Sequence, residues 1–347
     1  MRGLKVLLVL ASFLAFAYAF PVVIVDSKGY KVTLDKKPKR IVVAGGMWPL
    51  PALLIALGQD AKSLVYVPKA SISALTNSIL YKFYPDIKDI KSSNSDNIET
   101  LLSYKPDLFI CHTANDKLCN MMKETTVPTI MLDSNPYPHN YDSLNSLKAW
   151  LAVSGKILDK EKLSSDILKD TIQTRDFIAK RLKGIKPKKA LIIHRFNQGE
   201  GLAVGGLFAN YWLSNSGGLN VYKNLKGTKN VNLEDLYSKD IDVIFITNFN
   251  TLTPKDLESN KDYQFIKAVK NKQVYKFPLF TYRPFAPSLD ASLLLLFIAK
   301  TLHPMVFKDI DLNEKIKTHF KKFYNLDVSS KDIDSMLSPN PKAGLIK

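Results

Sequence analysis

Hydrophobic and polar positions along this chain form two kinds of pattern. Short apolar runs rich in β-branched residues predict buried strands, whereas apolar positions spaced three or four apart predict helices. We expect strands at residues 22–25, 31–34, 40–44, 63–67, 107–111, 128–132, 190–193, 241–246 and 273–277. We expect helices at residues 51–57, 98–103, 160–182, 208–215, 233–236, 263–269, 288–302 and 313–324. Because strands and helices alternate, the pattern indicates an α/β protein with parallel sheets covered by helices.

One helix–strand segment occurs twice with a constant spacing of 135 positions. The residues that the two copies share are Asn97, Glu99, Leu101, Ser103 and Asp107, and then Asn232, Glu234, Leu236, Ser238 and Asp242. Between the copies, residues 160–182 contain no glycine or proline and can form one long helix. The sequence therefore predicts two equivalent α/β lobes that are joined by a helix.

The first nineteen residues have the pattern of a secretory signal peptide. Arg2 and Lys5 precede an apolar run at 6–16, and small residues at 17–19 suit cleavage before Phe20. An uncleaved anchor is the alternative, but the run is short for a membrane span. No cysteine follows the run to carry a lipid anchor. We therefore expect an exported protein that is located in the periplasm.

The rest of the chain is long enough for two lobes and a connector. We place the boundaries as a signal peptide at 1–19, an N-terminal lobe at 20–143, a helical segment with the connecting helix at 144–184, a C-terminal lobe at 185–305, and a C-terminal helical extension and tail at 306–347. The polar end of that tail allows disorder.

The chain is strongly basic, with a formal net charge of +17. Loss of Arg2 and Lys5 with the signal peptide would leave +15. The lysines are scattered and no RNA-binding aromatic motif accompanies them, so we expect a solvated basic surface and no binding of nucleic acid. Attraction of anionic ligands or membrane surfaces stays open.

Cys111 and Cys119 are the two cysteines of the chain. A disulfide between them is allowed in an exported protein, and it would stiffen the loop that holds His112. The spacing does not match a zinc-binding pattern, and a site of cysteines alone would need more thiolates.

Five motifs between residues 22 and 307 together resemble those of one family. They are Val25-Asp26-x-x-Gly29-x-x-Val32-x-Leu34-x3-Pro38-x-Arg40-Ile41-Val42, Ala56-Leu57-Gly58, Glu99-x-Leu-Leu-x3-Pro106-Asp107, Gly217-Gly218-x-Asn220-Val221 and Leu302-His303-Pro304. The chain resembles the class III periplasmic substrate-binding proteins of ABC importers for iron–siderophore, haem, vitamin B12 or nickel chelates. The resemblance implies two Rossmann-like lobes with parallel sheets joined by one long α-helix.

The resemblance also implies a function and partners. The ligand would be a small-molecule metal chelate, with iron or nickel, bound in the cleft between the lobes with little closure. A monomer would deliver it to an inner-membrane ABC permease, and no intrinsic cofactor is expected. The family commonly carries a glutamate on each lobe to dock the permease, but here Ala52 and Tyr211 stand at those positions. The usual docking salt bridges are therefore expected to be absent.

In parallel sheets the ligand lies beyond the carboxyl ends of the strands. This rule selects as ligand-binding residues Trp48, Tyr66, His112, Arg195, Asn248, Tyr282 and Arg283. Arginine suits carboxylate or catecholate oxygens, and aromatic rings suit chelator rings. His112 and His194 are the candidate metal ligands.

Each of these residues also has a purely structural interpretation. His112 could cap a strand, His194 could point into the core, and the two arginines could form interlobe salt bridges. Trp48 and Tyr66 could lie at the edge of the core.

Two other functions compete with a chelate receptor. A receptor for a bare divalent metal would need three or four converging histidines and carboxylates. An exported enzyme is less favoured, because the chain contains no His-Glu-x-x-His, Gly-x-Ser-x-Gly or phosphate-loop motif.

Overall fold

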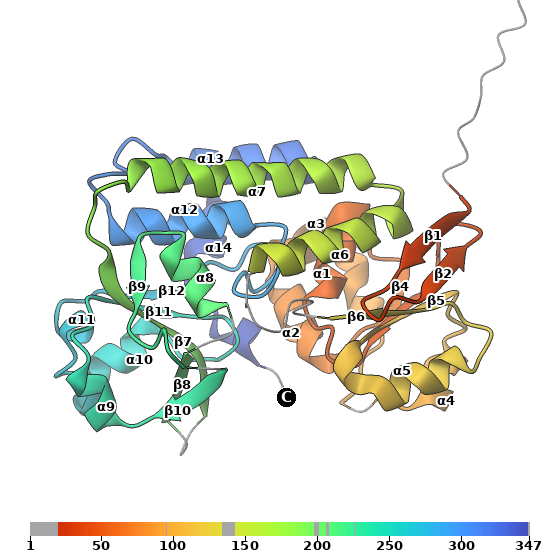
Figure 1. The fold of residues 1–347 in the computed structure, drawn as a ribbon, viewed down its shortest axis with the longest axis horizontal. Helices are drawn as coiled ribbons and strands as arrows, with labels where there is room; N and C mark the ends of the chain where they lie inside the picture. Colours follow the sequence, from red (N-terminus) through yellow and green to blue (C-terminus); the bar gives the residue numbers. More distant parts are fainter. Residues whose placement is uncertain are drawn as a thin grey trace, which may run out of the picture.

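The computed structural model describes residues 20–94, 96–133, 143–197, 201–205, 208–225 and 227–345. The predicted signal peptide lies outside the described residues. Two α/β lobes lie side by side, and α7 (Glu161–Arg181) runs along one side of both (Figure 1). The expected connecting helix at 160–182 is thus present as a single helix.

The N-terminal lobe contains a four-stranded sheet in which every strand pair is parallel. Its order is β4-β3-β5-β6, with β3 at Ile41–Ala44, β4 at Leu64–Tyr66, β5 at Leu108–His112 and β6 at Thr129–Leu132. A separate antiparallel hairpin, β1 (Val22–Val25) and β2 (Lys31–Leu34), opens the described chain. The helices of this lobe are α1 (Leu50–Gly58), α2 (Lys69–Asn77), α3 (Ile79–Phe83), α4 (Ile98–Ser103) and α5 (Asp116–Lys123).

The C-terminal lobe contains a mixed sheet rather than the parallel sheet that the sequence predicts. Its order is β10-β8-β7-β11-β12, with β9 also on β7, and the bounds are β7 Lys188–Asn197, β8 Gly201–Gly205, β9 Gly218–Asn220, β10 Thr228–Val231, β11 Val243–Ile246 and β12 Val274–Lys276. The strands β8 and β10 are antiparallel to their neighbours. Since β8 begins four residues after β7 ends, the chain has no room for a crossover helix and must form a hairpin.

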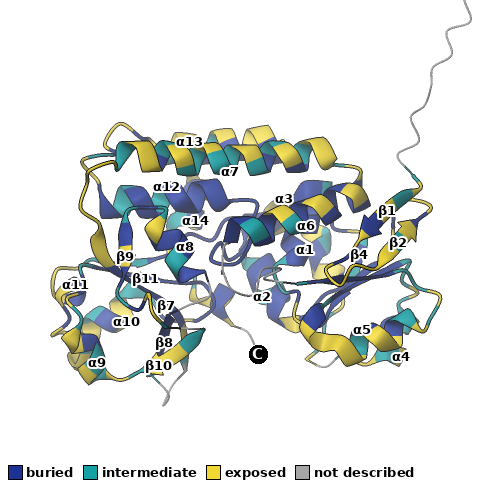
Figure 2. Ribbon diagram, in the orientation of Figure 1, coloured by how far each residue is buried: buried dark blue, intermediate teal, exposed yellow. Residues whose placement is uncertain are grey.

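Helices from both halves of the chain pack around the two sheets. Beside α7 lie α6 (Ser143–Leu158) and the apolar α12 (Ala291–Leu302), and the remaining α-helices are α8 (Ala209–Ser214), α9 (Leu233–Ser238), α10 (Pro254–Ser259), α11 (Lys267–Lys270), α13 (Leu312–His319) and α14 (Ser330–Leu337). Figure 2 shows α12 and central strands such as β11 largely buried, whereas α7 and α13 carry exposed positions on the outside. In the part of the chain described here, no helix combines the length and apolarity needed to cross a membrane.

The repeat found in the sequence is a structural repeat. The helices α4 and α9 begin and end at positions 135 residues apart, and so do the starts of β5 and β11. Asn97 and Asn232 cap the two helices by accepting main-chain N–H groups. The same short sequence pattern therefore builds the same helix–strand unit in each lobe.

Residues 306–345 have defined structure, although the polar composition of this tail allows disorder. After α13, a π-helical turn (Phe320–Tyr324) leads to α14 and to a 3-10 helix, η5 (Pro341–Gly344). Ala343 is completely buried, because this end packs between the lobes instead of extending into solvent.

Candidate functional site

A glycine turn follows β3 at the carboxyl edge of the N-terminal sheet. Gly45 and Gly46 have φ angles of 61° and 87°, in the left-handed region that favours glycine. The Gly45 N–H donates to Asp96 Oδ2 at 2.7 Å. A Cβ on Gly46 would lie 3.7 Å from His112 Cβ, so this turn and the end of β5 lie against each other.

His112 ends β5 and is half-buried. Its Nδ1 accepts the Ala114 main-chain N–H at 2.9 Å, and burial lowers the pKa of its imidazole. A neutral imidazole that accepts at Nδ1 carries its proton on Nε2. His112 is therefore arranged to donate a hydrogen bond rather than to offer a lone pair to a metal. Direct metal binding through Nε2 would require the other tautomer and loss of the bond from Ala114.

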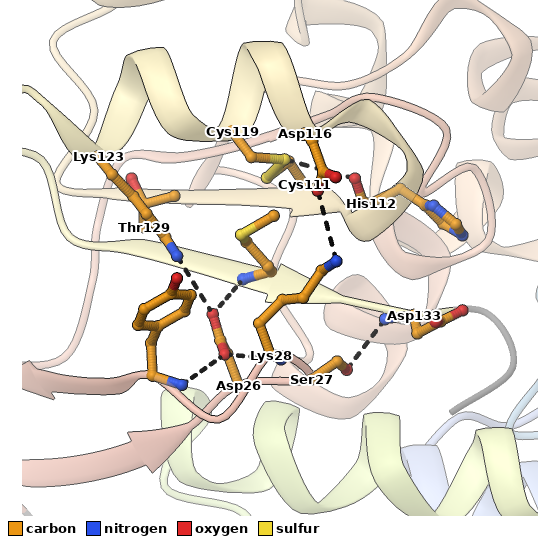
Figure 3. Close-up of polar contacts among 12 residues, drawn as sticks. Asp26, Ser27, Lys28, Cys111, His112, Asp116, Cys119, Lys123, Thr129 and Asp133 are labelled. Atoms are coloured by element: carbon orange, nitrogen blue, oxygen red, sulfur yellow. Dashed lines mark hydrogen bonds and ion pairs between the residues drawn. A yellow bond between two sulfur atoms is a disulfide. The ribbon is translucent and has the colours of Figure 1, made fainter. Parts of the chain in front are cut away.

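The end of β5, which carries His112, is held in place by a disulfide and by polar contacts (Figure 3). Cys111 and Cys119 form a disulfide between β5 and α5, and both residues are completely buried. The Asp26 carboxylate accepts the N–H groups of Lys28, Tyr30 and Met131 at 2.9–3.2 Å. These bonds hold the β1–β2 hairpin to β6.

Further contacts join the hairpin to the helix and the strand beside it. Lys123 Nζ lies 3.9 Å from Asp26 Oδ2 and 3.4 Å from the centre of the Tyr30 ring. Ser27 Oγ accepts the Asp133 N–H at 3.0 Å. In Figure 3 the His112 imidazole points away from the Asp26 carboxylate. The contacts around Asp26 therefore hold the end of β5 in place but do not include the imidazole.

Tyr66 is almost completely buried, although the sequence predicts it as a ligand-binding residue. Only 1% of the residue is exposed, and its ring stacks on Tyr104 with the centroids 5.7 Å apart. Its hydroxyl donates to Asp96 Oδ1 at 2.6 Å, and burial together with that bond raises its pKa to about 12. Through Asp96, Tyr66 positions the Gly45 turn. The strand-end rule does not select Asp96, because no strand ends at it.

Trp48 follows the glycine turn and is partly buried. Its side chain packs against the main hydrophobic core, and its carbonyl accepts the Ser71 hydroxyl at 2.8 Å. Trp48 therefore lies at the edge of the core and keeps part of its surface accessible.

His194 lies inside the C-terminal lobe, in β7. It is 6% exposed and sits between Phe249 and Phe285, with ring centroids 5.5 and 5.0 Å away. Burial, with a smaller effect from Arg195, lowers the pKa of His194 to about 3, so the ring is neutral. Within the described residues its Nδ1 has no hydrogen-bond partner. Arg195, the next residue, is exposed.

Three other predicted ligand-binding residues are buried and hydrogen-bonded to the protein itself. Asn248 Nδ2 donates to the carbonyls of Phe277 and Pro278 at 2.9 Å. The Tyr282 hydroxyl accepts from Arg283 Nη1 at 3.0 Å, and the two residues are 1% and 0% exposed. The Asn248 amide and the Arg283 guanidinium donate inside the fold and the Tyr282 hydroxyl accepts there, so a bound ligand would have to displace existing contacts to reach them.

Arg283 joins three separate parts of the chain. Its guanidinium donates to the carbonyl of Ala70 in α2 at 2.8 Å and to that of Ala343 in η5 at 2.9 and 2.5 Å. It also donates to Ser73 Oγ at 2.8 Å. Arg283 therefore links the two lobes. Its partners are main-chain carbonyls and the Ser73 hydroxyl rather than the carboxylates of a salt bridge.

The predicted site residues thus divide into two groups. Trp48, His112 and Arg195 keep accessible surface at or near strand ends, whereas Tyr66, His194, Asn248, Tyr282 and Arg283 are buried. Across the described ranges, no cluster of three or more His, Cys, Asp or Glu side chains is placed to hold a metal ion. The positions of the usual docking glutamates, Ala52 and Tyr211, are 1% and 7% exposed.

Comparisons with known proteins agree on one architecture. A family model described as "Periplasmic binding protein" matches residues 52–279. The chain is 24% identical over 343 residues to the molybdate-binding protein MolA of Haemophilus influenzae, with 92% of this chain and 96% of that protein covered. It is 27% identical over 270 residues to the Fe(3+)-citrate-binding protein YfmC of Bacillus subtilis, covering 73% and 77%. The solved structure of Helicobacter pylori CeuE in its Ni-His complex is 26% identical, with a TM-score of 0.72 and coverage of 91% and 99%.

Proposed function

The chain belongs to the family of periplasmic binding proteins, and from that premise we propose that it is a periplasmic receptor for a metal chelate. The chelate, of iron or nickel, binds between the two lobes. The receptor, acting as a monomer, then delivers it to an ABC importer in the inner membrane. The N-terminal signal peptide predicted from the sequence is the route of export.

The observation that carries this proposal is the chemistry of the accessible strand-end residues. The imidazole of His112 lies at the end of β5 in the N-terminal lobe, and the guanidinium of Arg195 belongs to an exposed residue of β7 in the C-terminal lobe. Both groups donate hydrogen bonds, and arginine matches planar oxygen pairs such as carboxylates. A ligand rich in anionic oxygens satisfies both lobes at once.

The named relatives support a small complex of this kind. The two curated relatives bind, by their names, molybdate and Fe(3+)-citrate, and the CeuE structure holds a Ni-His complex. Molybdate and ferric citrate both present anionic oxygens around a metal, as the donors on His112 and Arg195 require. A chelate with histidine carboxylates offers the same kind of oxygen.

A bare-metal receptor is the less favoured alternative. It would require His112 and His194 to coordinate the ion directly. His194 is buried between two phenylalanine rings, and the Nδ1 of His112 is already bonded to the Ala114 N–H. We therefore expect the chelator to supply most of the metal's donors.

Isothermal titration of the purified mature chain separates these possibilities. The probes are ferric citrate, nickel–histidine and molybdate, each beside free Ni²⁺ and Zn²⁺. We expect at least one of the two chelates, ferric citrate or nickel–histidine, to bind with a dissociation constant between micromolar and nanomolar, roughly −8 to −12 kcal/mol. Free metal should bind at least about a hundredfold more weakly, a gap of about 2.7 kcal/mol. Equal or tighter binding of a free metal, or constants above about 1 mM for every complex, would contradict the proposal.

A further inference from the structure

The last described residues, 340–345, form a segment that lies between the two lobes; we refer to it as the C-terminal segment (Figure 1). On the side of the C-terminal lobe, the carbonyl of Ala343 accepts two hydrogen bonds from Arg283. Gly344 packs directly on the main chain of Asn250, because a Cβ built on it would lie 2.0 Å from the Asn250 carbonyl oxygen. The close approach requires glycine at this position.

The same segment contacts the N-terminal lobe through α2. The Ser73 hydroxyl donates to the carbonyl of Leu345, and Arg283 bonds to both Ser73 and the Ala70 carbonyl. Asn340 Nδ2 reaches the carbonyl of Asn77 at the end of α2, at 3.5 Å. The C-terminal segment thus touches both lobes at once.

These contacts place the segment at the carboxyl ends of the sheet strands. The helix α2 follows β4, Asn250 follows β11, and Arg283 follows β12. β4 and β12 are edge strands of their sheets. Ligands of such sheets bind beyond the carboxyl ends of strands. The C-terminal segment therefore occupies the interlobe region at α2, Asn250 and Arg283, and we take the region beside His112 on β5 and Arg195 on β7 as the part left for a ligand.

The residues on which the C-terminal segment packs, Asn250 and Arg283, are held by buried hydrogen bonds. Lys276 is 4% exposed, and its ammonium donates to the carbonyls of Asn250 and Leu252 at 2.8 and 2.7 Å. Arg283 is completely buried and uses all three of its nitrogens in hydrogen bonds. Moving the segment would take the Ala343 carbonyl away from the buried Arg283 guanidinium, so displacement by a ligand would leave buried donors without an acceptor and would be costly.

We propose that the C-terminal segment is a specificity determinant that confines the ligand to the region beside β5 and β7, so that the receptor accepts small compact complexes and rejects large ones. This inference rests on the proposed function and adds a limit on ligand size. The accepted class is an iron or nickel ion held by one or two small acids, and the rejected class is a macrocycle or a chelate with several aromatic rings.

The test compares a small and a large ligand on the wild-type chain and on variants that remove the segment. The probes are ferric citrate and nickel–histidine as small complexes, and haemin and a ferric tris-catecholate as large ones. Gly344→Val introduces a side chain that the Asn250 main chain cannot admit, and truncation after Ser338 removes the segment but keeps α14. Lys342→Ala, at an exposed position of the same segment, is the matched control.

For the wild type and Lys342→Ala we expect at least a hundredfold preference for one small complex over both large ones. In Gly344→Val and in the truncated chain the preference should fall at least tenfold. Circular dichroism melts establish that each variant is folded, and the truncated chain carries the comparison if Gly344→Val unfolds. Tight haemin binding by the wild type, or an unchanged preference in folded variants, would overturn the size limit alone. Failure to bind any complex would overturn the proposed function and the size limit with it.

Discussion

Asp107 and Asp242, 135 residues apart, make the same main-chain contact in the two lobes. Asp107 Oδ1 accepts the N–H of Arg40, and its own N–H donates to the Arg40 carbonyl. Asp242 Oδ2 accepts the N–H of Lys189, and its N–H donates to the Lys189 carbonyl. Each aspartate therefore joins the start of one parallel strand to its neighbour, which explains why this residue recurs in both copies of the repeat.

Replacing Asp107 by alanine should lower the free energy of unfolding by about 1–3 kcal/mol, because two main-chain N–H groups lose a charged acceptor. Those groups belong to Lys39 and Arg40. Asp242→Ala should have an effect of similar size. Urea unfolding followed by circular dichroism measures both. Asp334→Ala, at an exposed helical position, is the control and should change stability little. No loss in Asp107→Ala would show that the repeat is not maintained by this contact.

The sequence predicted the elements of the fold better than it predicted the site. The long helix, the duplicated helix–strand unit and the position of His112 at the end of β5 follow from periodicity and strand polarity, which are local properties. Arg195, expected after a strand that ends at residue 193, lies inside the longer β7, where it pairs with Ala203 of β8. Burial of Tyr66 and Arg283 depends on Asp96 and on the C-terminal segment, which are distant in sequence. The polar composition of the tail does not predict that the Ala343 carbonyl accepts a hydrogen bond from Arg283, 60 residues earlier in the chain. The β8 hairpin was missed because β8 was not recognised as a strand.

Removal of the Cys111–Cys119 disulfide should destabilise the protein. The cross-link closes a loop of eight residues, for which the chain-entropy model gives about 2–3 kcal/mol. Both cysteines are buried, so a reductant should act slowly on the folded protein. The measurement is urea unfolding of Cys111→Ala/Cys119→Ala beside the wild type, each with and without reductant. A double variant as stable as the oxidised wild type would contradict this expectation.

His194 should make stability depend on pH in the acidic range. Its pKa is about 3 in the folded protein against an ordinary value of 6.5, so the unfolded chain takes up the proton first. The stabilisation is complete above pH 6.5 and is lost as the pH falls from 6.5 towards 3. Relative to His194→Gln, the wild type should lose up to about 1.4 kcal/mol per pH unit in that window. Parallel pH profiles for the two proteins would rule out a buried neutral imidazole.

Arg195 and His112 should contribute to ligand affinity rather than to stability. Loss of a charged hydrogen bond to the chelate in Arg195→Ala should weaken binding by about 1.5–3 kcal/mol. Arg195→Lys should recover only part of this, because lysine lacks the planar fork. His112→Ala should also weaken binding. Arg175→Ala, which removes a partly buried arginine from α7, is the matched control. A fall in melting temperature with unchanged affinity would assign Arg195 a structural role.

The most direct test of the central claim is the position of the metal in a crystal of the protein grown with its tightest-binding chelate. Anomalous scattering at the metal's absorption edge locates the ion independently of the rest of the ligand. We predict one strong peak between the lobes, with oxygens of the chelate within hydrogen-bonding distance of His112 Nε2 and of the Arg195 guanidinium. A peak on the outer surface of either lobe, or a metal bonded only to protein side chains with no chelator around it, would contradict the account.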